Sequence, residues 1–128
     1  MISYLTLGTN DLERAGRFYD AALAPLGRVR LPAYPNEIWY GPPGGPTELV
    51  ILHPFDGRPA TWGNGITVGL SVPDEATVQA IYTAALAAGG LDEGVPGPRP
   101  QYSADFYAAY VRDPDGNKLA FVRATQPG

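Results

Sequence analysis

Apolar and polar positions alternate at the start of the chain and again just past its middle. In residues 2–8 the leucines fall on one face, while Tyr4 and Thr6 fall on the other. Residues 65–70 repeat this alternation, with Thr67 set against an apolar face. A period of two residues is typical of a β-strand that buries one face. Both segments are therefore predicted to be strands.

A helical pattern follows each of these strands. Asn10 is the predicted N-cap of the first helix, because apolar residues recur at three- and four-residue steps over residues 12–26. Asp74 can cap a second helix, whose apolar positions continue until Gly89. The sequence thus predicts a strand and a helix at the opening of each half.

Each helix is followed by short extended segments that are separated by Gly and Pro clusters. The predicted segments are residues 28–31, 37–41 and 47–53 in the first half, and 91–102, 106–112 and 118–123 in the second. The repeated order predicts an α+β fold of two βαβββ modules, 1–58 and 65–125, which together form one domain. Pairing the modules would curve a mixed sheet around a central cup, and this cup is the expected ligand site.

Composition and charge exclude several classes of function. The chain has 128 residues, of which 45% are hydrophobic, and this is enough for one buried core. Its formal net charge of -4 and its lack of a Lys and Arg cluster predict no nucleic-acid partner. The absence of cysteine excludes thiolate chemistry and favours a reducing, cytoplasmic setting. No apolar run approaches the roughly 20 residues that span a bilayer, so we expect no membrane partner.

Three motifs occur within this pattern. Their order and separation together are more specific than any one motif alone. They are Asn10-Asp11-Leu12-Glu13-Arg14-Ala15-Gly16-Arg17-Phe18-Tyr19, Ala24-Pro25-Leu26-Gly27 and Asp113-Pro114-Asp115-Gly116-Asn117-Lys118. With the order of elements, they resemble the glyoxalase / bleomycin resistance protein / dioxygenase group, also called the vicinal oxygen chelate superfamily. The resemblance covers nearly the whole chain, and it implies the cup-shaped fold predicted above.

The resemblance also locates the positions at which family members hold a metal ion. Those members carry histidine on the first strand, histidine on the strand that opens the second half, and glutamate on the last strand. The matching positions here are Tyr4, Thr67 and Ala120, and none of the three is a good ligand. Glu48 is a possible acidic ligand whose facing the pattern does not fix, and His53 ends the fourth predicted strand. We therefore expect no metal and no cofactor.

The opposite face of the predicted strands, together with nearby aromatic residues, supplies the candidate ligand-binding residues. These are Tyr4, Thr6, Trp39, Thr67, Tyr102, Tyr107 and Ala120. Tyr4 has two possible roles. It could donate a proton or a hydrogen bond to a bound carbonyl, or its ring could simply fill the space of a lost metal, and we favour the space-filling role. The aromatic rings equally suit a dimer interface. Arg99 and Arg112 could pair with an anionic ligand, although we favour a surface role for both.

Three functions remain open at this stage. The first is a metal-free small-molecule-binding protein, comparable to the antibiotic-sequestering members of the family. The second is a lyase, isomerase or dioxygenase, which acts either without metal through Tyr4 or with unrecognised metal ligands. The third is a purely structural dimeric partner. We expect a homodimer because many relatives pair their modules, and the sequence names neither the ligand nor any catalytic residue.

Overall fold

The computed structural model describes residues 1–124 and contains the predicted repeat of strand, helix and three strands. Its elements are β1 (Leu5–Gly8), α1 (Leu12–Leu23), a 3-10 helix η1 (Ala24–Leu26), β2 (Val29–Leu31), β3 (Glu37–Gly41), β4 (Leu49–Leu52), β5 (Val68–Ser71), α2 (Glu75–Ala87), β6 (Leu91–Pro98), β7 (Tyr107–Arg112) and β8 (Lys118–Arg123). The predicted α+β fold is confirmed, with several strands shorter than expected. Residue 125, the predicted end of the second module, lies outside the described residues.

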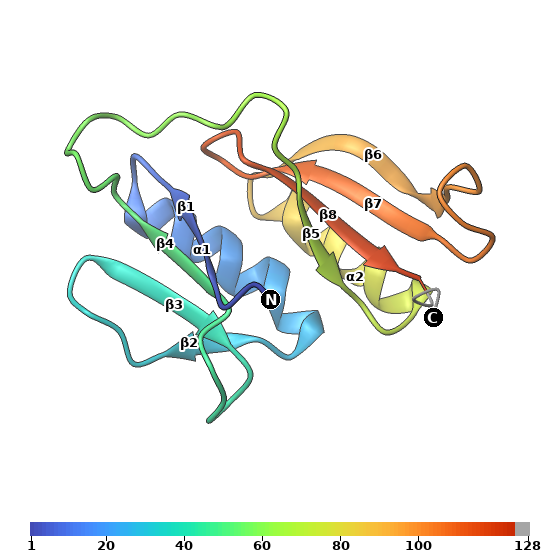
Figure 1. Ribbon diagram of the computed structural model, residues 1–128, viewed down its shortest axis with the longest axis horizontal. Coiled ribbons are helices and arrows are strands. Elements are labelled where there is room, and N and C mark those ends of the chain that lie inside the picture. The colour runs from blue at the N-terminus through green and yellow to red at the C-terminus, as the bar shows by residue number, and fades with distance from the viewer. Residues whose placement is uncertain (125–128) are drawn as a thin grey trace.

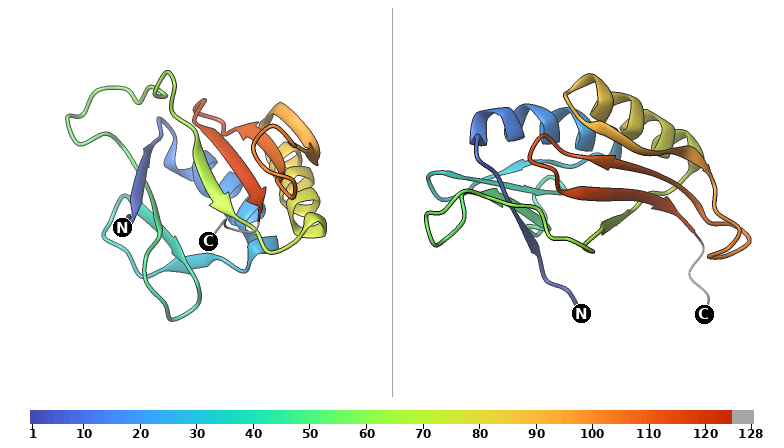
Figure 2. Two further views of the ribbon diagram at one scale, coloured as in Figure 1. Left: turned by 45° about the vertical axis from the view of Figure 1, so that its right-hand side comes forward. Right: turned by 90° about the horizontal axis from the view of Figure 1, so that it is seen from above.

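The strands form two four-stranded mixed sheets rather than one continuous curved sheet. The strand orders are β1-β4-β3-β2 and β5-β8-β7-β6. In each sheet the opening strand runs parallel to the last strand of its module, and the other pairs are antiparallel. The two sheets stand side by side in Figure 1, with β1 and β5 at sheet edges. Viewed from above in Figure 2, both helices lie on one side of the sheets.

The hydrophobic core fills the space between the helices and the sheets. Phe18 of α1 and Ile81 of α2 are fully buried, as are Ile51 of β4 and Phe121 of β8. All four belong to one cluster that contains side chains of both modules. Burying such a side chain contributes about 1.5–3 kcal/mol relative to leaving it in water. This shared core covers the face of each sheet that packs against the helices, so the opposite faces point away from the core.

Aspartate side chains begin both helices. Asp74 caps α2, as predicted, because its carboxylate accepts the backbone N–H three residues further on at 2.7 Å. The prediction for α1 was wrong by one residue, since Asp11 is the N-cap and accepts the equivalent N–H at 3.0 Å. The Asn10 side chain instead exchanges two hydrogen bonds with the backbone of Ala60. Among residues 1–124, no helix is long and apolar enough to cross a membrane.

Candidate functional site

The face of the second sheet that points away from α2 carries an open pocket of about 600 Å³, which we call the second-sheet pocket. Strand alternation builds its floor, because Val68 and Leu119 pack on the core while their neighbours Thr67, Gly69 and Ala120 line the pocket. Gly69 and Ala120 are paired across β5 and β8. With no side chain at Gly69 and a methyl group at Ala120, the floor leaves room for a ligand.

Aromatic and basic side chains form the wall of the second-sheet pocket. Tyr102 and Phe106 pack together with ring centroids 5.0 Å apart, and Tyr110 of β7 lies beside them in the pocket lining. Burial raises the pKa of the Tyr110 phenol, and nearby Tyr102 raises it further, whereas Arg99 opposes the shift. Tyr110 therefore stays a neutral hydrogen-bond donor near pH 7. Flat rings with polar tips suit a planar ligand.

A second pocket of about 580 Å³ lies on the matching face of the first sheet. Tyr4, Thr6 and Trp39 line this first-sheet pocket. The Trp39 indole N–H donates to a carboxylate oxygen of Glu37 at 2.7 Å, and Tyr34 packs edge-on against the indole at 5.3 Å between ring centroids. These contacts hold the indole ring in place, so the first-sheet pocket has a preformed aromatic wall.

The structure divides the seven predicted ligand-binding residues between three places. Tyr4, Thr6 and Trp39 lie in the first-sheet pocket, whereas Thr67, Tyr102 and Ala120 lie in the second-sheet pocket. The placement of Tyr107 was wrong. Its side chain is 9% exposed within the core, and its hydroxyl accepts a hydrogen bond at 2.8 Å from the amide of Gln79 on α2. Tyr107 points to the same face of its strand as Ala109 and Val111, which are both buried. This alternation in the sequence could have placed Tyr107 in the core.

Four other residues are placed by the structure relative to these two pockets. Lys118 and Arg99 line the second-sheet pocket, although sequence reasoning overlooked the first and favoured a surface role for the second. Lys118 lies two positions before Ala120 on the same strand and therefore points to the same face, so this alternation could have identified Lys118 as a pocket residue. Glu48 lines neither of these two pockets, because Arg28 binds its carboxylate at 2.7 Å. His53 places its Nδ1 3.0 Å from the Thr9 carbonyl oxygen, so this ring nitrogen has a backbone partner.

Comparison with known proteins places this geometry in one family. The model of the Glyoxalase/Bleomycin resistance protein/Dioxygenase superfamily matches residues 1–121. The chain belongs to this superfamily. The crystal structure of a glyoxalase/bleomycin resistance protein from Albidiferax ferrireducens T118 is 39% identical, with a TM-score of 0.85 over 98% of this chain and 99% of that one. Among curated proteins, none matches the chain.

Solved structures of lower identity share the fold. A glyoxalase-related enzyme from Fulvimarina pelagi is 24% identical with a TM-score of 0.74, covering 97% of this chain and 88% of that one. A lactoylglutathione lyase from Agrobacterium tumefaciens is 22% identical with a TM-score of 0.66, covering 97% and 93%. Identities this low show the shared fold alone, so the chemistry has to be argued from this chain's own residues.

The residues at the three positions where the family resemblance implies metal ligands do not suit a metal ion. Tyr4 supplies a phenol in the first-sheet pocket, while Thr67 and Ala120 supply a hydroxyl and a methyl group in the second-sheet pocket. A divalent ion of this kind needs three or more deprotonated or imidazole ligands. Across residues 1–124, no three His, Asp or Glu side chains come together in a way that could hold one.

The turn from Asp113 to Asn117 forms a buried polar network. Asp113 is 3% exposed, and its Oδ1 accepts the backbone N–H groups of Asp115 and Asn117, both at 2.9 Å. Its Oδ2 accepts the hydroxyl of Tyr19 at 2.5 Å and the side-chain amide of Asn117 at 2.9 Å. Burial raises the pKa of Tyr19 well above its ordinary value, and the Asp113 carboxylate raises it further. The phenol therefore remains a donor.

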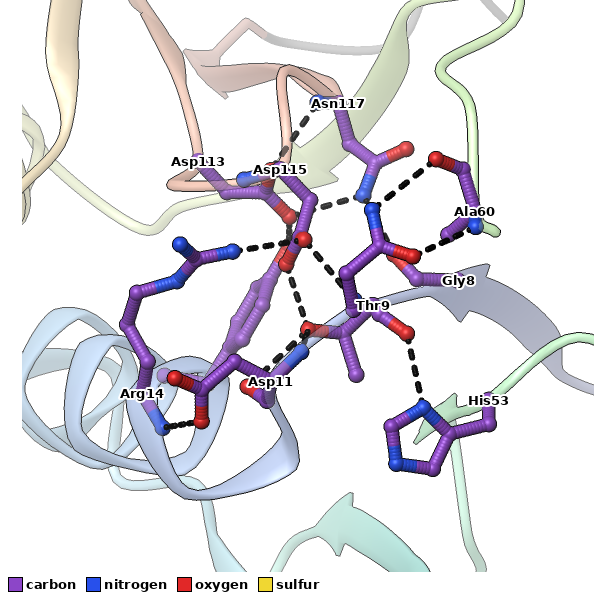
Figure 3. Close-up of polar contacts among 11 residues, drawn as sticks. Gly8, Thr9, Asp11, Arg14, His53, Ala60, Asp113, Asp115 and Asn117 are labelled. Atoms are coloured by element: carbon purple, nitrogen blue, oxygen red, sulfur yellow. Dashed lines mark hydrogen bonds and ion pairs between the residues drawn. The ribbon is translucent and has the colours of Figure 1, made fainter.

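The second aspartate of the turn completes the connection between the modules, as Figure 3 shows. Asp115 accepts hydrogen bonds from the Thr9 hydroxyl at 2.5 Å and from Arg14 Nη2 at 2.8 Å. The Asn117 amide donates to the carbonyl oxygen of Gly8 at 3.1 Å. Every carboxylate oxygen of Asp113 and Asp115 already accepts a hydrogen bond. The network thus fastens the turn before β8 to the start of α1, which sets how the two pocket-bearing sheets are oriented.

Proposed function

We propose that this protein binds a small molecule, without a metal centre, on the sheet faces that point away from the helices. The second-sheet pocket carries the proposal, because it combines about 600 Å³ of open space with an aromatic wall. Two of the three positions where relatives hold metal, Thr67 and Ala120, form part of its floor. Replacing charged ligands by small uncharged groups leaves a surface that favours the flat face of an organic ligand over a bare cation.

Catalysis through Tyr4 has less support. Tyr4 is 57% exposed, and within residues 1–124 its hydroxyl makes no hydrogen bond. A general acid needs a positioned group that orients its proton and, for efficient transfer, a pKa matched to the reaction. The polar groups that line the first-sheet pocket include Glu37, but this carboxylate is bound to the Trp39 indole. Binding without turnover is therefore the function that the geometry favours.

The test is a fragment screen of the protein after treatment with a metal chelator. Planar aromatic fragments should bind and be recovered chemically unchanged after prolonged incubation. Gly69→Leu provides the blocking variant, since a Cβ at Gly69 meets no atom within 4 Å and the added side chain would occupy the pocket without disturbing the fold. Ser71→Leu, on the same strand but outside the pocket lining, is the matched control and should bind as the unmodified protein does.

Each possible outcome of this screen has a clear meaning. Loss of binding in Gly69→Leu but not in Ser71→Leu supports the second-sheet pocket as the binding site. Binding that appears only after a divalent metal is restored contradicts the metal-free proposal. Turnover of a fragment by the chelator-treated protein would instead establish a metal-free enzyme, with Tyr4→Phe as the variant that tests a role for the phenol.

We also propose that the protein forms a homodimer through its sheet edges. Ile2 and Tyr4 next to β1 are 66% and 57% exposed, and Ile66 next to β5 is 60% exposed. Both strands are sheet edges, and apolar side chains gathered at free edges favour burial against a second copy. Light scattering should give twice the chain mass of 13.6 kDa. Ile66→Glu should shift the protein to a monomer, and a monomeric unmodified protein would contradict this proposal.

A further inference from the structure

The second-sheet pocket has a charge character that separates it from the first-sheet pocket. Two cations, Lys118 and Arg99, stand at the ring of Tyr110. The Lys118 Nζ lies 5.6 Å from the ring centroid, and the Arg99 Cζ lies 5.5 Å from it. A cation this close to an aromatic face is attracted to the π electrons. The ring therefore holds both positive groups at the pocket in a protein whose net charge is -4.

The two cations differ in how far they are already engaged. Arg99 donates at 2.8 Å to the carbonyl oxygens of Val95 and Gly97, which fixes the guanidinium in one orientation. Within residues 1–124, the side-chain ammonium of Lys118 has neither an ion pair nor a hydrogen bond. Its three N–H donors are thus available to a ligand.

Within residues 1–124, no carboxylate of the pocket lining pairs with Lys118 or Arg99. Glu93 is the one acidic residue of the pocket lining in the described part of the chain, and its Oε1 binds Arg112 Nε at 2.8 Å. The positive potential around Lys118 is consequently left for a ligand to balance. Beside it, the rings of Tyr102, Phe106 and Tyr110 offer a neutral, flat surface. Charge and shape together define what the pocket should accept.

We propose that the second-sheet pocket is specific for planar aromatic molecules that carry a carboxylate, with the carboxylate placed at Lys118. This inference rests on the proposed small-molecule-binding function and adds the chemical class of the ligand. The aromatic part of the ligand packs on the rings over the Gly69 and Ala120 floor. The Lys118 ammonium donates to the carboxylate oxygens, and the backbone-anchored Arg99 adds positive potential.

The experiment compares naphthoate with naphthamide, two aromatic probes of nearly the same shape that differ in charge. Amide NMR spectra of isotope-labelled, chelator-treated protein report the site, because the backbone N–H groups of Gly69 and Gly94 mark the second-sheet pocket. The indole N–H of Trp39 marks the first-sheet pocket. Naphthoate should shift the two glycine signals and bind about tenfold more tightly than naphthamide, as expected for hydrogen bonds to a charged group.

Lys118→Gln should reduce the affinity for naphthoate to within about twofold of that for naphthamide. Arg17→Gln is the matched control, since it also removes one positive charge but lies on α1 with a side chain that is 67% exposed. Its affinity for naphthoate should stay unchanged. In the unmodified protein, raising the salt from about 0.02 M to about 0.3 M should narrow the gap between the two probes by screening.

The results separate this inference from the function on which it rests. Equal binding of both probes at the glycine signals supports the small-molecule function and overturns the carboxylate preference. Preferential binding of naphthoate that Lys118→Gln leaves intact also overturns the assignment. If neither probe shifts the glycine signals, both the inference and the proposed pocket fail, because naphthamide tests binding to the pocket by a ligand without a carboxylate.

Discussion

Removing the Asp113 carboxylate should destabilise the protein far more than removing an exposed aspartate. In Asp113→Ala, four hydrogen bonds of 2.5–2.9 Å are lost, and the donors of Tyr19 and Asn117 are left without this acceptor. Breaking a buried charged network in this way costs about 3–5 kcal/mol. That is a large part of the roughly 5–15 kcal/mol by which domains are stable. Urea unfolding with an unchanged denaturant dependence would measure the loss.

A second substitution tests whether Tyr19 and Asp113 stabilise the protein through their direct hydrogen bond. In the unmodified protein, Tyr19→Phe should cost about 1.5–3 kcal/mol, because a hydrogen bond to a charged acceptor is lost. In the Asp113→Ala background the Tyr19 hydroxyl is buried without a partner, so its removal should cost nothing or be stabilising. Asp56→Ala is the control, since Asp56 is exposed and accepts one backbone hydrogen bond at 2.9 Å, and it should lose no more than about 0.5–1 kcal/mol. An equal cost of Tyr19→Phe in both backgrounds would refute the network.

Two further predictions follow from buried groups. Burial raises the pKa values of Tyr19 and Tyr40. The Asp113 carboxylate raises the pKa of Tyr19 further, and the Asp20 carboxylate does the same for Tyr40. In the unfolded chain, both phenols ionise near pH 10. The stability that these phenols contribute is complete below that pH and should fall as the pH rises above it, with phenolate absorbance from both appearing only on unfolding. Gly41→Ala should cost at least about 1–3 kcal/mol in thermal unfolding, because its Cβ would lie 2.2 Å from a backbone carbonyl oxygen. Gly69→Ala, which meets nothing within 4 Å, should change stability by less than about 1 kcal/mol.

The fold could be predicted because local patterns repeat through the chain. Alternation in residues 2–8 and 65–70, the cap at Asp74 and the three motifs each agree with one arrangement of elements. The polar network could not be predicted in the same way. Asp115 and Thr9 are 106 positions apart, and a local pattern does not indicate which distant side chains will meet. The motif from Asp113 to Lys118 therefore pointed to the family but not to its role in joining the modules.

Placement of the site residues depended on strand parity. Thr67 and Ala120 line the face away from the helices, and their apolar neighbours in the sequence mark the core face. Tyr107 and Tyr110 lie three positions apart and so point to opposite faces, and aromatic character alone does not distinguish them. The charge of the pocket depends on Lys118 reaching the Tyr110 ring, which is a contact between two strands. Such contacts become visible only when the strand register is known.

A crystal structure of the chelator-treated protein with a bound aromatic carboxylate would decide whether this superfamily member uses its second-sheet pocket without metal. We predict that the ring lies against Tyr110 above Gly69 and Ala120, with the carboxylate at Lys118. We also predict no ion bound to Thr67 or to the carboxylate of the ligand. A ligand seated elsewhere on the protein, or one held through a metal ion, would contradict the proposed function.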